Sequence, residues 1–127
     1  MFEVGIVAQF EAAHHLRGDF GPAARLHGHT YRVELVARGE QLRDDGTLFD
    51  VTVLQDAAGS VLAGWNYRNL DELPDFADRN TTVETVARTL FERVAPRLAG
   101  QGLASLVARV WESPVVYGAY EGDLSGP

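Results

Sequence analysis

Residues 10–37 read FEAAHHLRGDFGPAARLHGHTYRVELVA. They contain two segments in which apolar and polar residues alternate, separated by a polar loop. The first alternation of apolar and polar residues begins further upstream, at residue 2. A period of two is typical of a half-buried β-strand, so we predict strands over residues 2–13 and 30–37. The glycines, aspartate and proline of residues 18–22 predict a loop between the two strands.

Downstream of this stretch, the pattern predicts two helices followed by two strands. Asp50 can cap the first helix, which runs to about residue 63, and residues 81–84 resemble a capping box before the second helix. The other expectations are an irregular segment at 64–80, a helix end at Gly100 and Gly102, strands at 103–111 and 115–120, and a flexible tail at 121–127. The order β-β-α-α-β-β predicts one α+β domain over residues 1–120, an antiparallel sheet with two helices on one face.

Composition narrows the classes of partner and of chemistry. The chain has 127 residues, a formal net charge of −7 and no lysine, which argues against nucleic acid or an anionic membrane as partner. The absence of cysteine excludes disulfides, thiolate metal sites and cysteine nucleophiles. The first residues do not resemble a signal peptide, and no apolar run is long enough to span a membrane, so we expect a cytoplasmic protein.

The four histidines form two tight groups, His14-His15 and His27-Gly28-His29. Residues two apart on a strand point the same way, so His27 and His29 can aim at one point. His14 shares the parity of the apolar residues in the first strand, whereas His15 faces the other way. Three imidazoles and one open position are typical of a catalytic zinc site. The pattern alone is equally compatible with such a zinc site and with the alternative, in which His27-Gly28-His29 is a surface turn and His14-His15 is a chance pair.

A longer set of motifs decides between these alternatives. In chain order the segments are FEAAH (10–14), LHGHTY (26–31), GTLFD (46–50), RNLDELP (68–74), NTTVE (80–84) and VWES (110–113). Together they closely resemble the 6-pyruvoyltetrahydropterin synthase family, which includes the 6-carboxytetrahydropterin synthases. The resemblance covers nearly the whole chain. It implies the tunnelling fold and trimers whose sheets close into a barrel, often stacked as hexamers.

The resemblance also implies functional residues. The implied zinc ligands are His14, His27 and His29. Glu112 is expected to grip the ring of a pterin, because a carboxylate can accept two N–H bonds from an aminopyrimidine edge. Thr82 is a second candidate for substrate binding. Arg25, a loop cation in a chain with few cations, could meet an anionic group of the substrate.

The chain departs from the family at its acid–base groups. The family's cysteine, four residues before His27, is replaced by Ala23, and its Asp-His pair is replaced by Asn66-Tyr67. We therefore expect a zinc-dependent enzyme with altered catalysis, in which Tyr67 and Glu112 are the catalytic candidates. Its chemistry would be a lyase or C–C/C–N bond-forming reaction on a pterin-like or other aromatic amine or carbonyl substrate. The alternative is a catalytically silent pterin-binding or structural assembly protein.

Overall fold

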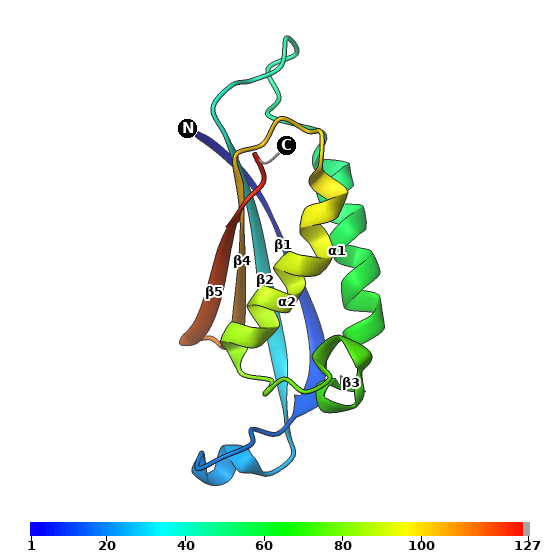
Figure 1. The fold of residues 1–127 in the computed structure, drawn as a ribbon, viewed down its shortest axis with the longest axis vertical. Coiled ribbons are helices and arrows are strands. Elements are labelled where there is room, and N and C mark those ends of the chain that lie inside the picture. Colours follow the sequence, from blue (N-terminus) through cyan, green and yellow to red (C-terminus); the bar gives the residue numbers. More distant parts are fainter. Residues whose placement is uncertain (126–127) are drawn as a thin grey trace.

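A five-stranded sheet covered on one face by two helices forms the body of the protein (Figure 1). The computed structural model describes residues 1–125. The strands are β1 (Phe2–His14), β2 (His27–Gly39), β3 (Arg68–Asn69), β4 (Ser105–Ser113) and β5 (Val116–Asp123). Their order across the sheet is β3-β1-β2-β4-β5, and every pairing is antiparallel except that of β1 with β3. The predicted α+β class is confirmed.

The two helices lie side by side on the same face of the sheet (Figure 1). They are α1 (Val51–Trp65) and α2 (Val83–Val94), and a short 3-10 turn, Ala95–Leu98, extends α2. Asp50 caps α1 as predicted, because its carboxylate accepts a hydrogen bond from the backbone N–H of Thr52 at 3.0 Å.

Alternation along the strands separates a buried face from an exposed face. On the helix-covered face, Phe10, Tyr31 and Leu35 are at most 1% exposed and form part of the core. The opposite face carries charged side chains that pair across strands, such as Arg38 with Glu3. A side chain at an even position of β1, or at an odd position of β2, therefore lies on the helix-covered face.

Four local expectations were wrong or incomplete. The segment 64–80 is not wholly irregular, since β3 pairs with β1 there and Leu70 and Phe76 enter the core. The capping box is wrong in detail, because Thr82 is the N-cap of α2 and accepts from the N–H of Thr85.

The two long strands extend further than the alternation predicted, since the β1–β2 ladder continues to the pair His14 and His27. The expected tail at 121–127 is wrong at its start, because β5 continues through Asp123. Residues 126–127 of that tail lie outside the described residues. Among residues 1–125, no helix is both long enough and apolar enough to cross a membrane.

Candidate metal centre

Three histidines meet at the end of the sheet from which the loop of residues 15–26 projects, the lower end in Figure 1. The β1–β2 register puts His14 directly opposite His27, and His29 follows on the same face of β2. The ring centroid of His14 lies 4.5 Å from that of His27 and 5.1 Å from that of His29. The potential ligand atoms of all three lie within 4.8 Å of one another. The predicted trio is thus brought together, and His15 is not part of it.

Backbone carbonyls orient two of the imidazoles. Nδ1 of His14 lies 2.8 Å from the carbonyl oxygen of Thr81, and Nδ1 of His27 lies 2.7 Å from that of Arg25. A carbonyl can only accept, so each Nδ1 carries the proton and each Nε2 keeps a free lone pair. Metal-binding histidines in proteins are typically held by such an outer hydrogen bond.

The free nitrogens fit a divalent metal. Nε2 of His14 and Nε2 of His29 are buried and have no hydrogen-bond partner within residues 1–125. Buried polar atoms are normally paired, and a metal ion would complete both. Ligand nitrogens in a tetrahedral zinc site are about 3.3 Å apart, which small side-chain rotations from the observed separation would reach. Three imidazoles without a thiolate suit zinc with one position left for water or substrate.

Burial keeps the imidazoles in their ligand form. Desolvation lowers the pKa of His14, and the hydrogen bond to Thr81 opposes this only in part. Desolvation also lowers the pKa of His29, against the opposing effect of the Glu112 carboxylate. Both rings therefore favour the neutral state, which is the state that binds a metal.

Glu112 lies on the same face of the sheet as the three histidines, because it continues the alternation of the buried residues Ala108 and Val110 along β4. Trp111 pairs with Tyr117 and Ser113 pairs with Val116, so Glu112 is the extra residue of a β-bulge. Here Oε2 of Glu112 lies 3.9 Å from Nε2 of His29, and the carboxylate remains about a quarter exposed. The carboxylate can thus contact a ligand that reaches the histidines from solvent.

A hydrogen-bond network that the sequence did not reveal supports the centre from behind. Oδ1 of Asp71 accepts a hydrogen bond from the Thr81 hydroxyl at 2.9 Å, and Thr81 in turn holds His14 through its carbonyl. Oδ2 of Asp71 accepts from the backbone N–H of His15 at 2.8 Å and lies 3.1 Å from Nδ1 of the same residue. Asp71 therefore ties the end of β1 to the segment that precedes α2. The only sequence signal was its place in the RNLDELP motif.

Tyr67 is an exposed residue beside β1. It has a positive φ of 58° and is 81% exposed, and its backbone N–H donates to the carbonyl of Glu11. It lines an open hollow of about 510 Å³ together with Glu11 and Thr30, which lie on the exposed face of the sheet by parity, and also with His29. Asn66 accepts a hydrogen bond from the N–H of Glu11 at 2.9 Å and so fixes the turn.

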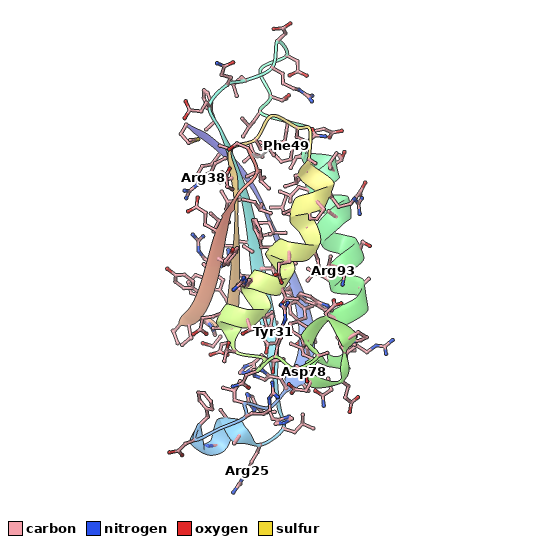
Figure 2. The ribbon with its side chains drawn as sticks, viewed as in Figure 1. Arg25, Tyr31, Arg38, Phe49, Asp78 and Arg93 are labelled. Carbon is pink, nitrogen blue, oxygen red and sulfur yellow. The ribbon has the colours of Figure 1, made fainter. Side chains whose placement is uncertain are left out.

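The two other candidates for substrate binding have structural contacts. The Thr82 hydroxyl caps α2. Arg25 contributes its carbonyl to His27, while its side chain points away from the body of the protein (Figure 2). Ala23 lies in the projecting loop, where its carbonyl accepts from the N–H of Leu16. In a single chain, the candidate site therefore consists of the three histidines, Glu112 and the Asp71 network.

This is an α+β protein with three imidazoles and a carboxylate gathered at one end of its sheet, an arrangement that could hold a metal ion. Comparison with known proteins gives the family. The model of the 6-pyruvoyl tetrahydropterin synthase family matches residues 3–123, and this chain belongs to that family. The fold is the tunnelling fold of its solved members. The structure of the Caenorhabditis elegans 6-pyruvoyl tetrahydropterin synthase superposes with a TM-score of 0.82, at 26% identity over 96% of both chains.

Two curated relatives carry different names. The 6-carboxy-5,6,7,8-tetrahydropterin synthase of Bacillus subtilis is 31% identical over 135 residues, which cover 98% of this chain and 90% of the relative. The dihydroneopterin monophosphate aldolase of Pyrococcus furiosus is 32% identical over 93 residues, which cover 73% of this chain and 75% of the relative. Relatives with synthase and aldolase names thus have nearly the same sequence identity to this chain, although the match to the aldolase covers less of it.

Proposed function

We propose that the protein is a zinc-dependent lyase that acts on a pterin-like substrate with acid–base groups different from those of its relatives. The observation that carries this proposal is the convergence of three imidazoles, two of them with buried unpaired Nε2 atoms, beside the Glu112 carboxylate. The pterin substrates and the synthase and aldolase activities in the names of its relatives favour this class.

In this proposal the histidines bind the metal and Glu112 binds the substrate. His14, His27 and His29 would bind zinc, which would polarise a substrate carbonyl or lower the pKa of a bound water. Glu112 would accept N–H bonds from the aminopyrimidine edge of the pterin. Glu112 is beside His29 and partly exposed. A pterin ring held by Glu112 would therefore place the side chain of the pterin at the histidines.

Proton transfer must differ from that of the family. Ala23 has no ionisable group, and Asn66 cannot carry charge. Loss of a general acid or base typically lowers a rate by about 10²–10⁴-fold. We therefore expect this protein to form 6-pyruvoyl- or 6-carboxytetrahydropterin more slowly than its relatives by about that factor. Incubation with dihydroneopterin triphosphate, followed by chromatography of the pterins, measures this. Rapid turnover would contradict the assignment of the altered groups.

We further propose that the active form is a trimer-based oligomer, either a trimer or a hexamer. Among the described residues 1–125, β3 pairs with β1 only at Ala12 and Ala13, so most of the outer edge of β1 is unpaired there. Long open edges favour pairing with another strand. Tyr67 lies at this edge, so its hydroxyl would take part in catalysis only within such an assembly. A stable monomer by light scattering at micromolar concentration would contradict both points.

Metal analysis with a matched pair of variants tests the centre. Wild-type protein should contain one zinc per chain. The His27→Ala variant should lose most of it, because it removes a ligand nitrogen. The control is His15→Ala, which removes a neighbouring imidazole that contacts Asp71 instead of the trio. Full zinc content in His27→Ala, or equal loss in both variants, would contradict the proposed ligand set.

A catalytically silent pterin-binding protein is the second candidate, and it is favoured by Ala23 and Asn66, which stand where the family has acid–base groups. The Glu112→Gln variant should weaken pterin binding in either case, because it removes the charge and keeps the shape. Product formation by the wild type separates the two. A protein that binds pterins through Glu112 and releases no product would be the silent binder.

A further inference from the structure

One buried polar atom at the metal centre is not explained by a metal. Among residues 1–125, the unpaired buried atoms include Nε2 of His14, Nε2 of His29 and the hydroxyl of Tyr31. The two nitrogens present lone pairs and are suited to a cation. The hydroxyl of a neutral phenol is a hydrogen-bond donor and needs an acceptor. Because buried donors are rarely left unpaired, the Tyr31 hydroxyl indicates a missing acceptor.

Tyr31 belongs to the same end of the sheet as the histidines. It follows His29 by two residues on β2 and so lies on the same helix-covered face, where it is only 1% exposed. Its ring centroid lies 5.3 Å from that of His29 and 6.0 Å from that of His14. Figure 2 labels it behind the first turn of α2, toward the end of the sheet that carries the histidines.

The position of the ring is held by packing. Tyr31 stacks on Phe10 across the β1–β2 pair, with centroids 4.7 Å apart and planes within 10°. The T-shaped contacts with His14 and His29 hold its other sides. A ring confined in this way has little rotational freedom, so the position of its hydroxyl is fixed relative to the histidines.

We propose that the Tyr31 hydroxyl contacts the substrate and donates a hydrogen bond to a substrate oxygen held in front of the three histidines. This inference rests on the proposed function, since it takes that space to be the substrate site. A donor fixed there would stabilise negative charge that develops on the oxygen during bond cleavage. Tyr31 would thereby supply a buried hydroxyl within one chain, whereas Tyr67 is 81% exposed.

The test uses cobalt-substituted protein and acetate, whose oxygens can bind the metal and accept a hydrogen bond. The visible spectrum of Co²⁺ is the readout. In Tyr31→Phe, Co²⁺ affinity should stay within about twofold of wild type, because the hydroxyl is not a ligand. Acetate affinity should fall about tenfold or more, since a hydrogen bond to a charged acceptor is lost. The control is Tyr120→Phe, the same change at a half-buried tyrosine that packs on Phe91. It should leave both affinities unchanged.

Equal acetate affinity in wild type and Tyr31→Phe would overturn the inference and leave the metal centre intact. Failure of the wild type to bind Co²⁺ would overturn the inference and the proposed function together. Unfolding of the metal-free variants gives a further check. Removal of an unpaired buried hydroxyl should not lower stability. A clear loss of stability in Tyr31→Phe would mean that the hydroxyl has its partner within the fold, and this would also overturn the inference.

Discussion

Replacing Asp71 by asparagine should weaken zinc binding although Asp71 touches none of the three ligand nitrogens. Its two oxygens accept from Thr81 on one side and from His15 on the other. An asparagine has one acceptor oxygen, so one of these partners must face an NH2 group instead. If Thr81 loses its anchor, the carbonyl that orients His14 is released.

The magnitude follows from the number and kind of bonds. Hydrogen bonds to a charged acceptor contribute about 1.5–3 kcal/mol each, and the carboxylate of Asp71 is only 15% exposed. The metal-free protein should therefore lose about 1–3 kcal/mol of stability. Outer hydrogen-bond partners of metal ligands typically change metal affinity by about 10- to 100-fold, and we expect Asp71→Asn to fall at the lower end of this range.

The matched control is Asp75→Asn, because Asp75 also anchors the segment between the helices. Its carboxylate accepts from the indole N–H of Trp65 at 2.8 Å and from Arg93, and it has no link to the histidines. Urea unfolding in the presence of a chelator measures the stability of both metal-free variants. Competition with a chromogenic chelator measures zinc affinity. If Asp71→Asn binds zinc as tightly as Asp75→Asn, the network supports the fold alone and the reasoning is refuted.

The remaining predictions concern packing and pH. Gly118→Ala should lower stability by about 1–3 kcal/mol, because the added Cβ would lie 2.9 Å from a Val83 methyl carbon of α2. Gly59→Ala, which faces open space on α1, should raise stability by about 0.5–1 kcal/mol; urea unfolding measures both, and effects of the same sign would contradict the packing argument. The metal-free protein should lose stability as the pH falls below about 6.5, because the lowered pKa values of His14 and His29 mean that the unfolded chain binds protons first. Chemical unfolding of chelator-treated protein between about pH 7.5 and pH 5 checks this, and a flat profile would contradict the burial of these rings.

Much of this protein could be predicted from local pattern. A period of two in residues 2–13 and 30–37 predicted the two long strands, and the parity of His14 predicted that it would lie on the buried face. The spacing of His27 and His29 predicted that both rings point the same way. These inferences hold because alternation along a strand is set by backbone geometry between near neighbours and does not require knowledge of the rest of the chain.

Other features were decided only by the tertiary structure. The segment 64–80 has no repeating pattern, and its pairing with β1 and the bond from His15 to Asp71 join residues more than 50 positions apart. Asp71 reaches His14 through Thr81, which is 67 positions from His14 in the sequence. The 3.9 Å distance of the Glu112 carboxylate from His29 depends on the register that places β4 beside β2. The exposure of Tyr67, which has a positive φ just after the end of α1, is also known only from the folded chain. Periodicity reports which side of an element is buried, whereas hydrogen bonds between distant segments determine which side chains meet, and these form only when the whole chain has packed.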